Sequence, residues 1–421
     1  MKALKKIMTP ARTIGAIALV GTLALGACGA SGVTSSGSTA TSATAVVAAS
    51  GTNGDTTAPP TAADALASNA KASYVKDGDW KVSDAVDVTL SGTTATSSSD
   101  AVSVSDGVLT ISKAGVYKLS GSFTGKVVVA AGTEDQVVLI LDNATITSPA
   151  GAAIEATSGD DLVLSLEGTS TITDGTYTGT EDANAAIYAD MDLTITGSGT
   201  LTVTSGASDA ITSKDDLYVL SGTINATASD DGLHGKDSLT IAGGTVTVNA
   251  NGDGLDSNGS LTISGGTTTV YGPASGANGA LDSNGAMSIR GGTVIAFATN
   301  EMVETPTTTD GQGWVSASAT GSAGSTVTIT DSSGSVLGTY TSLKAFGNVI
   351  YSTSGMTNGS TYTVSVDGTA TEATAGQGGG MGMGGQPPVG GPGQGGQPPT
   401  GGQPPAGGPG QGGQPPAAPQ G

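Results

Sequence analysis

Residues 237–258 have the sequence DSLTIAGGTVTVNANGDGLDSN, which repeats the pattern of the preceding residues 215–236, DDLYVLSGTINATASDDGLHGK. Both copies have 22 residues and combine short segments of alternating polarity with turns rich in Gly, Asp and Asn. The pattern recurs in 191–214 and 259–284, which are two and four residues longer, and again in 285–306. A fixed period of this length is typical of a solenoid in which each copy forms one coil.

Apolar residues recur at equivalent places of these copies and predict ladders of buried side chains. The three ladders are Leu193, Leu217, Leu239, Leu261 and Met287, then Ile195, Val219, Ile241, Ile263 and Ile289, and finally Ile211, Leu233, Leu255 and Leu281. Equivalent side chains would lie about 4.8 Å apart, the spacing of neighbouring strands. We therefore predict an all-β fold, a right-handed parallel β-helix over residues 135–306. Small β caps are expected at 71–134 and 307–370, because open solenoid ends expose unpaired backbone groups.

The first 28 residues have the features of an export signal, with basic residues before a short apolar stretch. The stretch ends in Leu25-Gly26-Ala27-Cys28, which resembles the lipobox of bacterial lipoproteins. That resemblance implies that Cys28 is lipidated and anchors the protein on the extracellular side of the cell membrane. An ordinary signal peptide is the alternative. We interpret 29–70 as a disordered Ser/Thr/Ala tether and 371–421 as a disordered Gly/Pro/Gln-rich tail.

The composition excludes several classes of function. The 421 residues include 14 basic and 35 acidic side chains, a net charge of −21, and only 3% are aromatic. A protein that binds nucleic acid needs clustered Lys and Arg, so we expect no nucleic-acid partner. A single cysteine excludes a disulfide framework and a cysteine zinc site. We expect a monomer.

Four runs within the repeats resemble a known family: 185–188 (AAIY), 192–201 (DLTITGSGTL), 231–234 (DGLH) and 239–244 (LTIAGG). They are similar to secreted carbohydrate-binding β-helix proteins first described from cellulolytic bacteria, which are structurally akin to pectate lyases. The resemblance implies a right-handed parallel β-helix that binds calcium and polysaccharides such as cellulose and polygalacturonate. It implies no established catalysis.

Aspartates at equivalent places of successive coils predict a metal site. Asp209, Asp231 and Asp253 share one position, Asp230 adjoins it, and Asp256 and Asp282 share another position three residues further along. Carboxylates about 5 Å apart repel one another by roughly 1 kcal/mol in water, and Ca²⁺ would cancel this repulsion. The predicted Ca²⁺ ligands are Asp209, Asp230, Asp231, Asp253 and Asp256. The alternative is that these residues only stabilise turns, for which Asp is suited.

Four residues beside this ladder are predicted to contact carbohydrate. They are Tyr188, Lys214, His234 and Lys236. The ring of Tyr188 could lie against a sugar face, and the two lysines could meet uronate carboxylates. Alternatively, the lysines only neutralise the surrounding aspartates.

Three functions remain open from the sequence. The first is a surface-anchored, calcium-dependent protein that binds polysaccharides of the cellulose or pectin type without catalysis. The second is a calcium-dependent polysaccharide lyase with Lys214 or Lys236 as the base. The third is a purely structural adhesin, whose aspartate ladders only hold the coils together.

Overall fold

The computed structural model describes residues 79–179, 182–308 and 311–378. The expected signal (1–28), tether (29–70) and most of the expected tail (371–421) lie outside these residues. Apart from one 3₁₀ turn, Val82–Asp84, the regular elements of the described residues are strands. None of these residues forms a helix that is long and apolar enough to cross a membrane.

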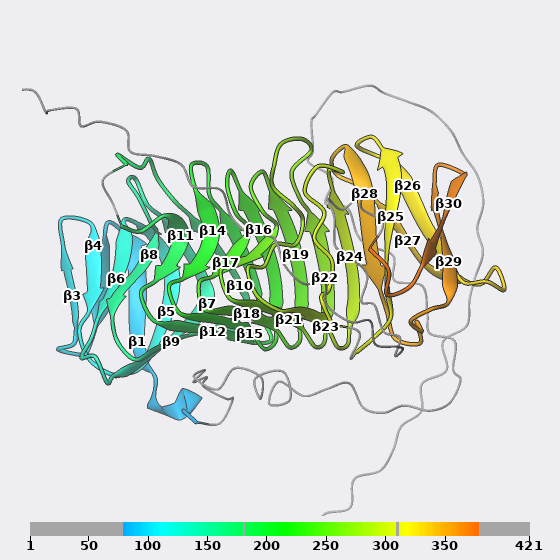
Figure 1. Cartoon of the computed structure of the whole chain (residues 1–421). Coiled ribbons are helices and arrows are strands. Elements are labelled where there is room, and N and C mark those ends of the chain that lie inside the picture. Colours follow the sequence, from blue (N-terminus) through cyan, green and yellow to red (C-terminus); the bar gives the residue numbers. More distant parts are fainter. Residues whose placement is uncertain (1–78, 180–181, 309–310, 379–421) are drawn as a thin grey trace, which may run out of the picture. The chain divides into compact units, whose positions relative to one another are not determined.

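The strands of the central part form a parallel β-helix of about eight coils (Figure 1). Each complete coil contributes one strand to each of three parallel stacks. The first stack contains β5 (Gly115–Thr124), β7 (Gln136–Thr147), β9 (Asp161–Glu167), β12 (Asp192–Gly197), β15 (Asp216–Val219), β18 (Ser238–Ile241), β21 (Ser260–Ile263) and β23 (Met287–Ile289). The second contains β10 (Thr169–Thr173), β13 (Thr200–Thr204), β16 (Thr223–Ala228), β19 (Thr245–Ala250), β22 (Thr267–Tyr271) and β24 (Thr293–Ala298). The third contains β6 (Lys126–Ala130), β8 (Ile154–Ser158), β11 (Ala185–Ala189), β14 (Asp209–Ser213), β17 (Leu233–Gly235) and β20 (Leu255–Ser257).

The register of the stacks confirms the predicted apolar ladders. Leu217 pairs with Leu193 on one side and Leu239 on the other, and Leu261 pairs with Met287. In the third stack, Leu233 pairs with Ile211 and with Leu255. These side chains are buried in one continuous core that runs through the coils. The predicted parallel β-helix is therefore confirmed, and its register fixes which polar side chains share an outer column.

Both ends of the coils are covered by antiparallel strands, as the fold prediction required. At the N-terminal end, β1 (Val86–Gly92) forms a hairpin with β2 (Thr94–Ser97), and β3 (Val102–Ser105) forms one with β4 (Val108–Ile111). At the other end, β28 (Phe346–Ser352) lies between β24 and β25 (Trp314–Gly321). A four-stranded sheet follows, made of β27 (Val336–Thr341), β26 (Thr326–Thr330), β29 (Thr361–Val366) and β30 (Thr369–Thr374).

A glycine in each of several coils has a backbone conformation that other residues rarely adopt. Gly222, Gly244 and Gly266 have φ angles of 93°, 81° and 74°. A Cβ atom on Gly244 would lie 2.6 Å from the carbonyl oxygen of Gly222 in the preceding coil. The turn therefore needs glycine for two reasons, the positive φ and the close approach of the neighbouring coil.

We expect Gly244→Ala to destabilise the protein by more than the conformational strain of about 1–3 kcal/mol, since the clash adds to the strain. Gly324→Ala is the matched control, because Gly324 also has a positive φ of 87° but a Cβ there would meet nothing within 4 Å. Chemical denaturation of both variants measures the difference. Equal losses of stability in the two variants would show that the contact between coils is unimportant.

Candidate functional site

One outer column of the third stack carries most of the residues singled out from the sequence. Pairing places Tyr188 beside Glu155 and Thr212, and His234 beside Thr212 and Asp256. Asp282 follows Asp256, because Leu255 forms a bridge with Leu281. The column follows from alternation: each of these residues directly precedes or follows a buried core residue and so points outward.

Cluster 1 consists of Asp209, Asp231 and His234, whose candidate ligand atoms all lie within 4.8 Å of one another. Asp209 is 1% exposed, and its Oδ2 accepts hydrogen bonds from Asn184 Nδ2 (2.8 Å) and Thr212 Oγ1 (2.9 Å). The Nδ1 atom of His234 is 3.8 Å from the same oxygen. Among the described residues, neither His234 Nδ1 nor Asn184 Oδ1 has a hydrogen-bond partner, although both atoms are buried. When Nε2 of His234 carries the proton, Nδ1 and the amide oxygen are two unsatisfied acceptors beside a buried carboxylate, an arrangement that suits a bound cation.

Cluster 2 consists of Asp253, Asp256 and Asp282, which satisfy the same distance criterion. Glu304, from the segment after β24, lies beside this cluster. Its Oε2 accepts a hydrogen bond from the backbone of Ser283 (3.1 Å). Burial and the neighbouring Asp282 raise the pKa of Glu304. Hard cations such as Ca²⁺ prefer a set of oxygen ligands of this kind.

The imidazole of His234 connects the two clusters. Its Nε2 lies 3.3 Å from Asp256 Oδ2 in cluster 2, while its Nδ1 faces Asp209 in cluster 1. Burial alone would lower the pKa of His234, but the carboxylates of Asp209 and Asp256 raise it overall.

The aspartates of the first ladder also hold the coils together. The backbone N–H of Asp231 donates to Asp209 Oδ1 (3.2 Å), that of Asp253 to Asp231 Oδ1 (2.6 Å), and that of Gly279 to Asp253 Oδ1 (2.5 Å). The ladder can end in Gly279, because this last position only donates its backbone N–H to Asp253 and needs no side chain that accepts a hydrogen bond. The turn-stabilising role weighed from the sequence is therefore present, and it uses Oδ1 of each aspartate, while Oδ2 of Asp209 faces His234.

Burial and mutual repulsion make Asp231, Asp253 and Asp256 hard to ionise. Burial, followed by the charge of Asp209, raises the pKa of Asp231 to about 7. Burial and the nearby Asp282 raise the pKa values of Asp253 and Asp256 to about 6. A divalent cation would favour the ionised form of each group, so the donor set fits a calcium-type ion.

The structure separates the five predicted ligands. Asp209 and Asp231 lie in cluster 1, Asp253 and Asp256 in cluster 2, and Asp230 is exposed and in neither. Sequence reasoning left out two carboxylates of the second site. Both could have been included, because Asp282 and Glu304 occupy the position of Asp256 one and two coils further on.

The four predicted carbohydrate contacts differ in accessibility. Tyr188 is only 5% exposed, packs with Ala183 and Ala185, and has Lys214 Nζ 5.6 Å from its ring centroid. The expectation that its ring lies against a sugar is therefore wrong for this structure, because the ring is covered. Lys236 is exposed and Lys214 is half-buried. Among the described residues, no carboxylate oxygen lies within 4.0 Å of either ammonium group, unlike Lys113, Lys118 and Lys126.

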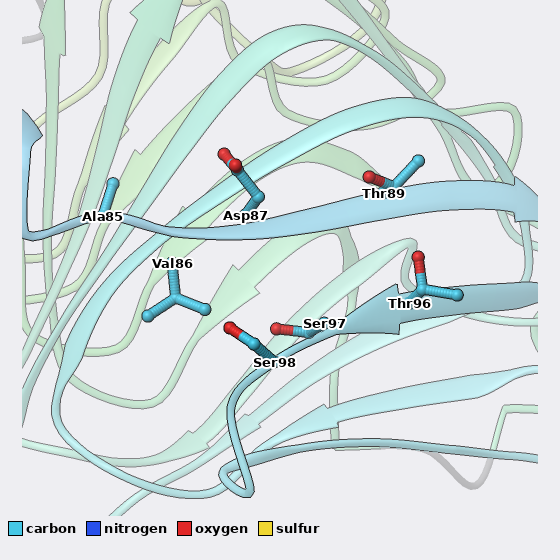
Figure 2. A pocket seen from close by; sticks show the side chains of 7 residues that line it. All are labelled: Ala85, Val86, Asp87, Thr89, Thr96, Ser97 and Ser98. Carbon is cyan, nitrogen blue, oxygen red and sulfur yellow. The ribbon is translucent and has the colours of Figure 1, made fainter.

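A hollow lies elsewhere, at the N-terminal cap. It has a volume of about 510 Å³ and is lined by Ala85, Val86, Asp87, Thr89, Thr96, Ser97 and Ser98. Figure 2 shows that its polar groups come from β1 and from the end of β2. Its walls carry one carboxylate and several hydroxyls but neither a base nor an aromatic ring, so the clusters remain the stronger candidate.

Comparison with known proteins identifies the family of this chain. Residues 105–370 match the model of the family of carbohydrate-binding domain-containing proteins. A carbohydrate-binding domain-containing protein of Acetivibrio thermocellus is 34% identical over 137 residues, which are 31% of this chain and 48% of that relative. The match thus spans about half of the relative.

A solved structure of a polysaccharide lyase-like protein from C. thermocellum, a gadolinium derivative, is also similar. The match covers 52% of this chain and 95% of that one, with 26% identity and a TM-score of 0.43. Since the family model matches more than half of the residues, the chain belongs to the family of carbohydrate-binding domain-containing proteins, as the resemblance in the repeats predicted.

Proposed function

We propose that this chain is a surface-anchored, calcium-dependent protein that binds polysaccharides of the pectin or cellulose type without catalysis. Family membership supports carbohydrate binding. The two clusters support the calcium dependence, because they contain Asp231, Asp253 and Asp256, whose pKa values are raised towards neutrality, and because cluster 1 adjoins buried atoms without a hydrogen-bond partner among the described residues. Asp209, Asp231 and His234 would hold one ion, and Asp253, Asp256, Asp282 and Glu304 a second. When bound, the ions supply positive charge that attracts ligand carboxylates and cancels the repulsion among the aspartates.

The observation that carries the proposal is the pair Lys214 and Lys236 beside the two clusters. In a strongly acidic chain, ammonium groups normally pair with carboxylates, yet neither of these does so within the described residues. Lysines that form no ion pair, next to candidate Ca²⁺ sites, suit an acidic glycan better than a neutral one.

Binding to immobilised polygalacturonate, with and without a calcium chelator, tests this function. We expect retention in calcium and release by the chelator, with weaker retention on cellulose, which lacks carboxylates. The double variant Lys214→Met/Lys236→Met should lose most of the polygalacturonate binding, while Lys81→Met, at the N-terminal cap, should not. Retention that changes neither with the chelator nor with the substitution of both lysines would contradict the proposal and favour the structural-adhesin alternative.

A lyase is the second candidate, because a lysine next to a bound cation can remove a proton adjacent to a uronate carboxylate. The same polygalacturonate samples can be followed by the ultraviolet absorbance of unsaturated uronates. We expect no increase with calcium at any pH. A steady increase that Lys236→Met abolishes would replace the binding proposal by a catalytic one.

We also infer that the lipobox-like sequence anchors the protein through Cys28, on the extracellular side of the membrane. Cys28→Ser should move most of the protein from the membrane fraction to the soluble or secreted fraction, because the lipid supplies the hydrophobic attachment. Ser31→Ala is the control and should leave the membrane fraction unchanged. Immunoblots of both fractions measure the distribution, and membrane retention of Cys28→Ser would contradict the anchor.

A further inference from the structure

Four polar residues form a second column beside the one that holds His234 and Asp256. They are Lys214, Lys236, Asn258 and Asn284, one in each of four successive coils, and are called the axial column here. The backbone shows that they are in register: Lys214 N–H donates to Ala189 O, Lys236 N–H to Ser213 O and Asn284 N–H to Ser257 O, each in the preceding coil. Asn258 directly follows Ser257, which pairs with the glycine that precedes Lys236.

The axial column offers hydrogen-bond donors that the described residues leave free. Asn258 and Asn284 are exposed, as is Lys236. The Nε2 atom of His234 lies 3.0 Å from Asn258 Oδ1, so when Nε2 carries the proton the amide oxygen is held and the NH₂ group is left for a ligand. The column therefore presents two ammonium groups followed by two amides, all on the same side of the coils.

The spacing of these groups selects a particular kind of ligand. Successive coils are separated by about 4.8 Å, so the four groups span about 14 Å. The distance between neighbouring coils is close to the length of one pyranose unit in an extended glycan. Lysines prefer carboxylates, whereas asparagine amides bind hydroxyl and carbonyl oxygens.

We propose that the axial column binds four consecutive sugars of a linear acidic glycan lying along the solenoid axis, one sugar to each coil. Lys214 and Lys236 contact the carboxylates of two uronate units, and Asn258 and Asn284 contact the next two units through their oxygens. The arrangement rests on the proposed function, and it adds the direction of the glycan, its minimum length and a role for two asparagines.

Calorimetric titration in calcium, with galacturonate oligomers of two, three, four and six units, tests the arrangement. Affinity should increase with each unit up to four and level off between four and six. Lys236→Met should weaken binding of every length by about tenfold, the value of one hydrogen bond to a charged group. Asn284→Ala should reduce the affinity for the four-unit oligomer to that for three units and leave the two-unit oligomer unchanged. Lys81→Met should change none of these values.

The outcomes separate this inference from the function on which it rests. A wild-type protein that binds none of the oligomers and no polygalacturonate would overturn both. Normal binding with an affinity that rises steadily beyond four units would overturn only the axial arrangement. The axial arrangement alone would also be overturned if Asn284→Ala weakened the binding of all oligomer lengths equally, or of none. Unchanged melting temperatures of the variants would show that they remain folded, since both asparagines are exposed.

Discussion

Calcium is expected to raise the midpoint of thermal unfolding by about 5–10 °C at pH 8 and by very little at pH 5. A ligand at a hundredfold excess over its dissociation constant stabilises the folded state by about 2.7 kcal/mol. Each kcal/mol corresponds to about 2–4 °C for a domain of this size. The pH dependence follows from the carboxylates, because cations bind their ionised form and the pKa values of Asp231, Asp253 and Asp256 are about 7, 6 and 6.

Without metal, stability should change in the opposite direction with pH. The carboxyl groups of Asp231, Asp253 and Asp256 have higher pKa values in the folded state than an aspartate in an unfolded chain, so the folded protein binds more protons than the unfolded chain. Their contribution is fully present below about pH 4 and is lost as the pH rises through 6 to 7. The raised pKa of His234 acts in the same direction. The melting temperature in chelator should therefore fall from pH 5 to pH 8.

Melting curves at both pH values, with calcium and with chelator, check this pair of trends. Asp331→Asn is a suitable control, because Asp331 lies in an exposed turn of the C-terminal sheet and outside both clusters. It should respond to calcium like the wild type. An equal response at pH 5 and pH 8, or none at either, would remove calcium from the proposed function.

The sequence predicted the columns of this site but not how their side chains group. Register follows from the apolar repeat, because a shift of one residue would turn Leu233 and its equivalents out of the core. That is why Thr212, His234 and Asp256 lie in one column. Their division into two clusters depends on side-chain directions, which a repeat does not specify. Asp230 illustrates this, since it adjoins Asp231 in the chain but is exposed.

One difference arises from a segment that departs from the repeat. Tyr188 is covered by residues around Ala183, in a stretch longer than the ordinary coil, and its burial depends on how that stretch folds back. The path of that stretch is not determined by periodicity, so this contact could not be inferred from it. Glu304, by contrast, continues the column of Asp256 and Asp282 by one coil, and its Oε2 accepts a hydrogen bond from the backbone of Ser283, so its place does follow from the repeat.

Two substitutions of Asp231 should have opposite effects on the metal-free protein at pH 8. Asp231→Asn keeps an oxygen that accepts the hydrogen bond from the backbone of Asp253, and it removes a buried charge whose ionisation is unfavourable. It should melt at or above the wild-type temperature in chelator. Asp231→Ala leaves that N–H without its acceptor, which costs about 1–3 kcal/mol, so it should melt several degrees lower.

Calcium then distinguishes the two roles of this carboxylate. Both variants should lose the part of the calcium stabilisation that cluster 1 provides, because neither retains the charged oxygen. A direct titration of calcium should accordingly find weaker or fewer sites in both, whatever their melting temperatures in chelator. If Asp231→Asn binds calcium like the wild type, Asp231 is only a cap between coils. If instead Asp231→Ala is as stable as Asp231→Asn in chelator, the hydrogen bond to Asp253 contributes little. The aspartate ladder would then owe its presence to the ion alone.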